Sequence, residues 1–350
     1  MAARERFALD TLQVPIVGAP LAGGPSTPAL AAAVSDAGGI GFLGAGYKTV
    51  DAVAEDLRAT RALTDRPFGV NLFAPPAPVA DRAAVERYAA ELEADAARVG
   101  APVGAPRHDD DGWDAKLALL ARERPAVVSV TFGCPPAGVV AALHDSGCAM
   151  WVTVTTPAEA LLARDAGADA LVVQGVEAGG HRGSFDDGPA GDLGLLALLA
   201  LVSAAVDLPL VATGGIATGR AIAASRAAGA AAAQLGSALL LAPEAGTTPA
   251  HRAALREGRP TALTRAFTGR TGRGIVNRFM VEHDAQAPSA YPDVHHLTAP
   301  LRAAARERGD GELLNLWAGQ AHALAREAPA AEIVRTLAAD AYRALSVRVF

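Results

Sequence analysis

The chain repeats a short pattern of polar and apolar positions. A helical segment ends in a small or acidic pair and a glycine, and a continuous apolar run follows, as in SDAGGIGFLG (35–44) and RDAGADALVV (164–173). HDSGCAMWVTV (144–154) and SRAAGAAAAQLG (225–236) repeat the pattern. Glycine tolerates the left-handed conformation that stops a helix, and apolar runs without alternation are typical of parallel strands covered on both faces. The pattern therefore predicts a series of helix–strand units.

Eight apolar runs of this kind are predicted to be strands. They are VPIVGAP (14–20), GIGFLGAG (39–46), PFGVNLF (67–73), AVVSVTFG (126–133), AMWVTVT (149–155), ALVVQGV (170–176), PLVATGG (209–215) and AAAQLGSALL (231–240). Helical segments separate them, which predicts an α/β fold of the (βα)8 TIM-barrel type rather than a doubly wound sheet. GAGYKT (44–49) has threonine where a dinucleotide-binding fingerprint has its third glycine, and Lys48 does not follow a glycine as a P-loop requires.

Two segments depart from the repeat. Residues 75–125 contain the proline-rich APPAPVA and the turn-rich APVGAPRHDDDGW, and they predict a helical insertion after the third strand. Residues 243–350 predict a helical extension. We find no linker long enough to separate either segment as an independent domain. We therefore expect residues 1–242 to form the barrel and residues 243–350 to pack on it within the same structural unit.

Composition and charge exclude several classes of partner. The 350 residues are 51% hydrophobic and carry a net charge of −6 without a basic run, so we expect no nucleic acid. The run 193–206 is shorter than the ~20 residues that span a bilayer, and the N-terminus lacks the apolar core of a signal peptide, so we expect no membrane partner. Two cysteines, Cys134 and Cys148, fit a reducing, cytoplasmic location.

The chemistry of a (βα)8 barrel lies at the carboxyl ends of its strands. Here those ends carry small residues, neutral hydrogen-bonding groups and one histidine, with no carboxylate cluster. They are Ala19–Pro20–Leu21, Gly44–Ala45–Gly46, Asn71, Thr131, Thr153, Thr155, Gln174 with the EAGGHRG loop, Thr213–Gly214–Gly215 and Gly236–Ser237. Such a wide, flat, uncharged pocket suits a planar heteroaromatic cofactor.

Two glycine-rich turns, ATGGIATG (212–219) and QLGSALL (234–240), follow the seventh and eighth predicted strands. Loops at these positions commonly bind phosphate, because glycine lets amide groups converge on an oxyanion. The alternative, that these glycines only make tight turns, is less favoured because both turns stand where phosphate loops occur. A barrel, a phosphate cup and a flat amide-lined pocket together suggest flavin mononucleotide (FMN).

The stretch QGVEAGGHRG (174–183) combines four glycines with one histidine. The glycines would let the backbone approach a ligand while His181 points at it, which favours a catalytic histidine over one that only orders the loop. We expect Arg182 to pair structurally, with Glu177 or Asp186. No HExxH motif or cysteine cluster is present, and His295 and His296 are adjacent and so point apart. We therefore expect no metal.

These blocks, together with YPDVHHLT (291–298) and NLWAGQA (315–321), resemble the nitronate monooxygenase family, formerly 2-nitropropane dioxygenases, over nearly the whole chain. The resemblance implies bound FMN and a catalytic His181. Ser237 replaces a threonine common in the family, and SVTFGCPP (129–136) departs from the family's apolar-histidine forms. The residues expected to contact FMN are Ala19, Pro20, Leu21, Asn71, Gln174, Gly179, Gly180, Gly214, Gly215, Gln234, Leu235, Gly236, Ser237, Trp317, Gly319 and Gln320.

The resemblance further implies oxidation of an alkyl nitronate, or of a nitroalkane deprotonated first, by O2 to a carbonyl compound and nitrite. Tyr291 and His295 are candidates for contacts with this small nitro compound. His181 would act as a general base or as a hydrogen-bond partner, with a pKa near the ordinary ~6.5. Two alternatives stay open: an NAD(P)H-dependent flavin reductase of the enoyl-thioester or quinone kind, and a non-catalytic flavin-binding barrel. The sequence also leaves open whether the chain forms a homo-oligomer.

Overall fold

The eight predicted apolar runs form one parallel sheet. A computed structural model describes residues 6–188 and 192–346. The strands follow the order β1-β9-β8-β6-β5-β4-β3-β2, and a parallel bridge between Val17 and Ile40 joins the first strand to the last, so the sheet closes into a barrel. The barrel strands are β1 (Ile16–Gly18), β2 (Gly41–Gly44), β3 (Phe68–Phe73), β4 (Val127–Thr131), β5 (Ala149–Val154), β6 (Ala170–Gln174), β8 (Leu210–Thr213) and β9 (Ala232–Leu235).

Helices surround this barrel, and glycines stop them as the sequence pattern predicts. Gly38, Gly147, Gly167 and Gly229 all have φ between +87° and +100°, in the left-handed region that glycine occupies without steric cost. The helices that follow the barrel strands are α1 (Pro28–Asp36), α2 (Val50–Leu63), α5 (Trp113–Glu123), α6 (Ala137–Asp145), α7 (Pro157–Ala166), α8 (Leu195–Ala205) and α9 (Gly219–Ala227). The predicted (βα)8 barrel is confirmed.

The strands are apolar throughout because both of their faces are buried. Val17, Phe42, Trp151, Val172 and Val211 fill the inside of the barrel near the amino-terminal ends of the strands. The neighbouring positions on the same strands pack outward under the helices. Period-2 alternation is therefore absent, as expected of a parallel sheet with two covered faces.

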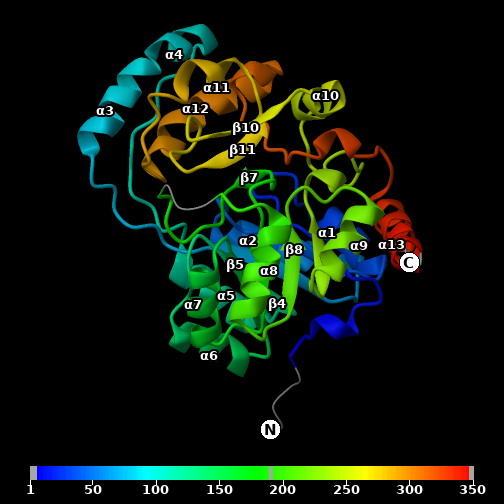
Figure 1. Ribbon diagram of the computed structural model, residues 1–350. Coiled ribbons are helices and arrows are strands. Elements are labelled where there is room, and N and C mark those ends of the chain that lie inside the picture. Colours follow the sequence, from blue (N-terminus) through cyan, green and yellow to red (C-terminus); the bar gives the residue numbers. More distant parts are fainter. Residues whose placement is uncertain (1–5, 189–191, 347–350) are drawn as a thin grey trace.

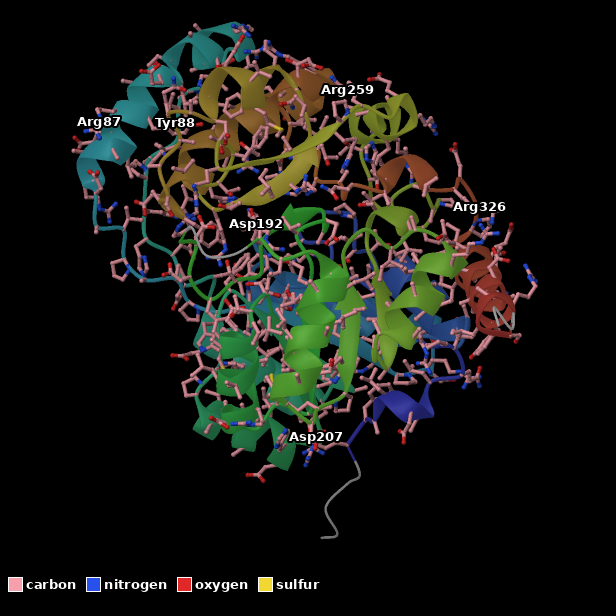
Figure 2. The ribbon with its side chains drawn as sticks, viewed as in Figure 1. Arg87, Tyr88, Asp192, Asp207, Arg259 and Arg326 are labelled. Carbon is pink, nitrogen blue, oxygen red and sulfur yellow. The ribbon has the colours of Figure 1, made fainter. Side chains whose placement is uncertain are left out.

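The insertion after β3 divides between two neighbours. Its last helix, α5, packs on α2 and β3, whereas α3 (Arg82–Glu91) and α4 (Glu93–Val99) turn away to meet the C-terminal extension. Figure 2 shows Tyr88 of α3 directed toward the extension, where its hydroxyl donates a hydrogen bond to the carbonyl of Ala266 at 2.6 Å. Asp95 of α4 pairs with Arg278 at 2.9 Å and with His283 at 2.7 Å. The insertion thus holds the extension from its outer side.

The extension forms a cap over one end of the barrel, opposite the N-terminus (Figure 1). Its helices were predicted, but its two strands were not. β11 pairs with β10 on one side and with the two-residue β7 on the other, in an antiparallel sheet. The elements of the cap are α10 (Pro249–Glu257), β10 (Thr261–Thr264), β11 (Gly272–Ile275), α11 (Arg278–His283) and α12 (Asp293–Arg308), and β7 (Gly180–His181) belongs to the loop after β6. Four single 3-10 turns are η1 (Leu9–Thr11), η2 (Ser237–Leu239), η3 (Gly311–Leu313) and η4 (His322–Leu324).

The last helix of the extension, α13 (Ala330–Ser346), leaves the cap and returns to the barrel. It packs against α9 and α1 (Figure 1). It thus fills the position in the ring of helices after β9, which is followed by the 3-10 turn η2 and not by an α-helix. Across the described residues, no helix is both long enough and apolar enough to cross a bilayer.

Candidate active site

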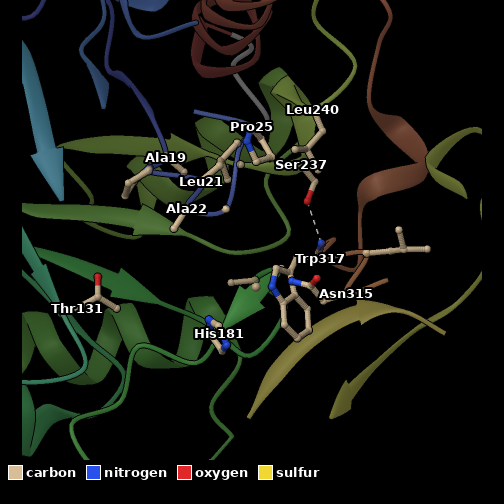
Figure 3. Close-up of a pocket in the computed structure, with 18 of the residues that line it drawn as sticks. Ala19, Leu21, Ala22, Pro25, Thr131, His181, Ser237, Leu240, Asn315 and Trp317 are labelled. Carbon is tan, nitrogen blue, oxygen red and sulfur yellow. Dashed lines mark hydrogen bonds between the residues drawn. The ribbon is translucent and has the colours of Figure 1, made fainter. Parts of the chain in front are cut away.

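A cavity of about 420 Å³ lies between the carboxyl ends of the barrel strands and the cap, a size typical of small-molecule sites (Figure 3). Most of the residues predicted from the sequence line it. They are Ala19, Pro20, Leu21, Asn71, Gln174, Gly179, Gly180, His181, Gly214, Gly215, Gln234, Gly236, Ser237, His295, Trp317 and Gly319.

Three predicted residues do not line the cavity. Leu235 points outward into the core between strands and helices, because its neighbour Gln234 takes the inward position. Gln320 is exposed, and its backbone amide donates to the carbonyl of Glu177 at 3.0 Å. Tyr291 lies behind the wall, with its ring centroid 6.1 Å from that of His181 and 5.7 Å from that of Phe132.

Gln174 holds the glycine-rich loop from within. Its side-chain amide donates to the carbonyl of His181 at 3.1 Å, and its side-chain oxygen accepts from the Gly183 amide at 2.8 Å and from Arg182 at 3.1 Å. Both ends of this amide are therefore engaged by the loop itself. Gln174 reaches the cavity wall, but its hydrogen bonds fix the loop that carries His181.

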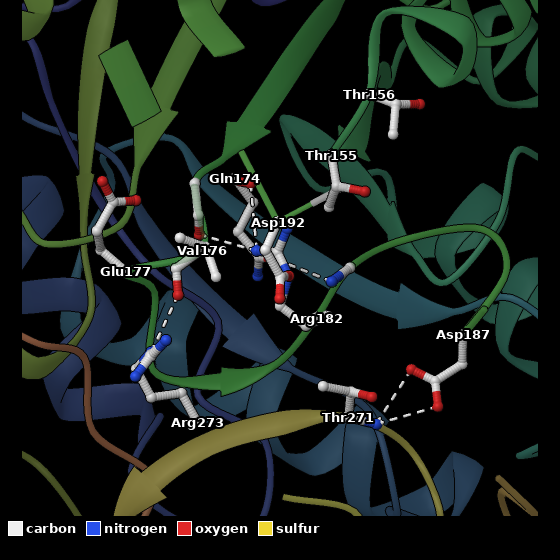
Figure 4. Close-up of polar contacts among 12 residues, drawn as sticks. Thr155, Thr156, Gln174, Val176, Glu177, Arg182, Asp187, Asp192, Thr271 and Arg273 are labelled. Carbon is white, nitrogen blue, oxygen red and sulfur yellow. Dashed lines mark hydrogen bonds and ion pairs between the residues drawn. The ribbon is translucent and has the colours of Figure 1, made fainter. Parts of the chain in front are cut away.

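Two charged residues of the loop bind backbone groups (Figure 4). The carboxylate of Glu177 accepts from the amide of Leu195, the first residue of α8, at 3.0 Å. Arg182 donates to the carbonyl of Gly175 at 2.8 Å and lies 3.7 Å from Asp192. The expected pairing of Arg182 with Glu177 or Asp186 is wrong, because the buried guanidinium turns back on the start of its own loop.

The cap fixes the backbone of His181 by sheet pairing. Gly180 and His181 form β7, which pairs with Arg273 and Gly272 of β11. The next amide, that of Arg182, donates to the carbonyl of Thr271 at 2.8 Å. Sheet hydrogen bonds from a separate segment therefore restrain the loop, and its many glycines do not leave it free.

The glycines of the loop instead permit close approach. A Cβ atom on Gly179 would lie 2.4 Å from the amide nitrogen of Gly319, and one on Gly319 would lie 2.8 Å from the carbonyl oxygen of Glu177. Neither position can carry a side chain without moving backbone. The NLWAGQA block is thus packed directly against the loop, and this contact places Trp317 beside His181 with 5.2 Å between ring centroids.

His181 has one partner among the described side chains. Its Nε2 lies 2.8 Å from the hydroxyl of Thr268, and the ring is half-buried among Phe132, Tyr291 and Trp317. Its pKa is lowered from the ordinary 6.5 to about 3, chiefly by burial; the charges of Arg270 and Arg302 contribute to this lowering, and that of Asp187 opposes it. The sequence-based expectation of a pKa near ~6.5 is therefore wrong, since the imidazole is neutral throughout the physiological range.

The aromatic wall opposite this histidine contains residues that the sequence did not single out. Tyr47 and Phe132 line the cavity with φ of +66° and +77°, a conformation that non-glycine residues rarely adopt. The ring of Tyr47 stacks on His295 at 4.1 Å and 5°. Phe132 directly follows β4, and Tyr47 lies three residues after the end of β2; this position near a strand end was the signal available in the sequence.

The insertion supports this wall. Asp111 accepts from the amide of Tyr47 at 2.9 Å and pairs with the fully buried Lys116 at 2.8 Å. Lys116 also donates to the carbonyl of Ala45 at 3.0 Å. A buried ion pair thus holds the turn after β2 in its strained conformation.

Two arginines place positive charge around the same wall. The guanidinium of Arg270 lies 4.1 Å from the ring centroid of Phe132 and donates to backbone carbonyls, whereas Arg302 donates to Thr298 and to the carbonyl of His295. Within residues 6–188 and 192–346 neither arginine has a carboxylate within 4 Å. Because a buried charge without a counterion is costly, the arrangement favours an anionic ligand.

The other end of the cavity is formed by the two predicted glycine turns. Gly236 has φ of −105°, and a Cβ atom there would meet only Leu21 and Ala19, at ordinary contact distances of 3.6 and 3.7 Å. Packing of the protein therefore does not require glycine at this position, which leaves space for a ligand. Gly215 differs, because its φ of +67° and a Cβ 3.1 Å from that of Glu177 already explain the glycine.

The neutral histidines around the cavity should make the protein sensitive to acid. Burial lowers the pKa of His251 to about 4 and that of His295 to about 2, as it does for His181. Each contributes stability above its unfolded pKa of ~6.5, and this stability is lost as the pH falls toward the folded value. Near pH 5, unfolding should therefore be accompanied by the uptake of up to about three protons at these histidines. Each proton changes the free energy of unfolding by about 1.4 kcal/mol per pH unit.

The slope of the free energy of unfolding against pH, from urea denaturation between pH 7 and pH 5, measures this uptake. His181→Asn should reduce the uptake by about one proton while keeping a polar side chain. An unchanged slope in that variant would show that His181 titrates normally in the folded protein.

Comparisons with known proteins show the family to which the chain belongs. The nitronate monooxygenase family model matches residues 6–340. Nitronate monooxygenase of Pseudomonas aeruginosa is 44% identical over 339 residues, covering 93% of this chain and 95% of that protein. That of Paraburkholderia phytofirmans is 41% identical and covers 92% of this chain and 91% of its own.

Among solved structures, nitroalkane oxidase from Streptomyces ansochromogenes superposes with a TM-score of 0.93 at 51% identity, covering 96% of this chain and 98% of that one. FabK from Thermotoga maritima is more distant, with a TM-score of 0.74 and 26% identity over 96% and 94% of the two chains. The family match and the identity of these relatives agree over nearly the whole length, and the chain belongs to the nitronate monooxygenase family.

Proposed function

We propose that the protein is an FMN-dependent oxidoreductase that oxidises alkyl nitronates with O2 to carbonyl compounds and nitrite. The observation that carries the proposal is the neutral His181 set among two buried arginines without carboxylate partners. The nitronate monooxygenases and the nitroalkane oxidase among its relatives support the same reaction class.

The charges of the site favour a nitronate over its parent nitroalkane. A nitronate is an anion, and Arg270 and Arg302 place positive charge at the aromatic wall with no carboxylate within 4 Å of either guanidinium among the described residues; Asp187, farther away, offsets part of the charge of Arg270. A histidine with a pKa of about 3 is also a weak base, so abstraction of a proton from a neutral nitroalkane is costly. A substrate that arrives already deprotonated avoids that cost.

The residues of the cavity fit FMN. The space beside Gly236 would accept phosphate oxygens, and the side chains of Gln234 and Asn71 face the cavity with amide groups for a heteroaromatic ring. The amide nitrogen of Asn71 is bound to Ser129 and Thr131, which leaves its oxygen as an acceptor. Bound FMN would supply the redox chemistry, taking electrons from the nitronate and passing them to O2.

The protein's own part is to bind, orient and exclude water. The hydroxyl of Thr268 donates to the carbonyl of Arg270 at 3.2 Å, so its oxygen accepts the proton of His181 Nε2 at 2.8 Å. Nδ1 of the neutral ring then carries no proton and is a hydrogen-bond acceptor. Phe132, Tyr47 and Trp317 keep the reacting carbon in an apolar environment.

A second candidate is an NAD(P)H-dependent flavin reductase, because FabK shares the fold at 26% identity. Such an enzyme would use the same barrel and the same flavin. The positive wall beside His181 fits a small anion over the flavin, and therefore favours the nitronate.

Gly236→Val should abolish FMN binding and preserve the fold. The branched side chain fills the space left by glycine, and at a φ of −105° it does not have to enter the left-handed region. Circular dichroism should be unchanged, whereas FMN should no longer raise the free energy of unfolding by the ~2.7 kcal/mol expected at a hundredfold excess over Kd.

Gly236→Ala serves as the graded control, since one methyl group makes only ordinary contacts with Leu21 and Ala19. Gly215→Val is a poorer test, because its positive φ strains any side chain. Full FMN occupancy in Gly236→Val would mean that this turn has no part in binding the cofactor.

His181→Asn should separate the two substrate forms. With a preformed nitronate no proton has to be abstracted, so the loss should stay within about 1.4 kcal/mol, or roughly tenfold in kcat/KM. With nitroethane the proton must also be accepted by a side chain, and the loss should reach about 10²–10⁴-fold from an already low wild-type value. The measurement is kcat/KM for nitroethane and for its preformed nitronate, with bound flavin quantified in both proteins; equal losses would reduce His181 to a binding group.

A further inference from the structure

His322 is a buried histidine in the cavity wall that neither the sequence motifs nor the mechanism above uses. It is 4% exposed and begins η4, immediately after the NLWAGQA block. Its Nδ1 lies 3.1 Å from the carbonyl oxygen of Gly319, whereas its Nε2 is buried and has no hydrogen-bond partner among the described residues. A buried polar atom without a partner is costly, and its presence in a cavity wall indicates a ligand atom opposite it.

The same glycine ties this histidine to the predicted phosphate turn. The amide of Gly319 donates to the hydroxyl of Ser237 at 2.8 Å, while its carbonyl receives the imidazole of His322. One residue, Gly319, therefore sets His322 beside the turn after β9. Ser237, Gly236 and His322 all line the same cavity.

This part of the wall contains no stronger cation. The cavity-lining residues contributed by the turns after β8 and β9, by α10 and by η4 include no lysine and no arginine, and Arg302 and Arg306 belong to α12 on another side. A phosphate there would have two histidines as its nearest ionisable neighbours, His251 and His322. The Nε2 of His251 is already 3.1 Å from the carbonyl of Trp317. Of these two histidines, His322 presents a buried ring nitrogen without a hydrogen-bond partner among the described residues.

The tautomer of His322 follows from its partner. A carbonyl oxygen only accepts, so Nδ1 must donate to Gly319, and a neutral ring then has no proton on Nε2. To donate to a phosphate, Nε2 must be protonated, which makes the ring an imidazolium.

We propose that His322 binds the cofactor phosphate as an imidazolium, so that retention of FMN depends on its phosphate and is coupled to uptake of a proton. This inference rests on the proposed FMN cofactor.

The groups packed against η4 are consistent with this role. They come from η2, which has no ionisable side chain, and from α10. On α10, burial lowers the pKa of His251 to about 4, with the charge of His322 adding to the effect, so His251 is neutral. Arg252 donates to the carbonyls of Leu241, Ala242 and Ala245, and Arg256 pairs with Glu327. The carboxylate of α10, that of Glu257, pairs with Arg259 at 3.1 Å and is not among the residues that line the cavity.

The test compares FMN with riboflavin, which lacks the phosphate, on protein stripped of flavin. His322→Asn keeps a donor for Gly319 and removes Nε2, and it should weaken FMN binding by about ten- to a hundredfold, the range of a charge-assisted hydrogen bond, with riboflavin affinity unchanged. His322→Gln, which places an uncharged donor near Nε2, should recover part of the loss. His251→Gln is the matched control and should leave the ratio of FMN to riboflavin affinity as in wild type.

Calorimetry in buffers of different ionisation enthalpy gives the second readout. Wild-type protein at pH 7.5 should take up more protons on binding FMN than His322→Asn does, and no such difference should appear with riboflavin. Parallel loss of FMN and riboflavin affinity, or equal proton uptake in the two proteins, overturns the proposal for His322 while leaving the cofactor assignment intact. Wild-type protein that binds neither flavin overturns both.

Discussion

The contact between the EAGGHRG loop and the NLWAGQA block is the constraint on which the site depends. Gly179 and Gly319 approach so closely that neither can carry a Cβ atom. That approach brings Trp317 beside His181 and His322 beside the turn after β9. The two ends of the cavity are thus positioned by one backbone contact, which explains why a chain connection needs so many glycines here.

The barrel could be predicted from the sequence because its signals are local. Continuous apolar runs, and helix-stopping glycines such as Gly38 and Gly167, indicate the secondary structure of the segments in which they lie. β7, β10 and β11 could not be predicted, because GH and GRGI carry no strand pattern and become strands only through pairing with one another. Propensity is overridden there by tertiary contacts.

The lining of the cavity was predictable where it is made by strand ends and glycine-rich loops, as for Asn71, His181 and Gly236. Its electrostatics were not. The pKa of His181 depends on burial by the cap and on Arg270 and Arg302, which are 89 and 121 positions away in the sequence. Tyr47 and Phe132 adopt a positive φ that no local sequence pattern predicts. The conformation of Tyr47 is held by Asp111 and Lys116, which are distant in the sequence.

The central claim is that the positive, histidine-bearing wall selects a nitronate as the electron donor to the flavin. Anaerobic mixing of the yellow, FMN-loaded protein with ethyl nitronate or with NADPH tests it most directly, with flavin absorbance followed in a stopped-flow instrument. The account predicts that the nitronate bleaches the flavin rapidly, that NADPH does so slowly or not at all, and that O2 restores the colour with release of nitrite. Rapid bleaching by NADPH and none by the nitronate would contradict it and identify a reductase.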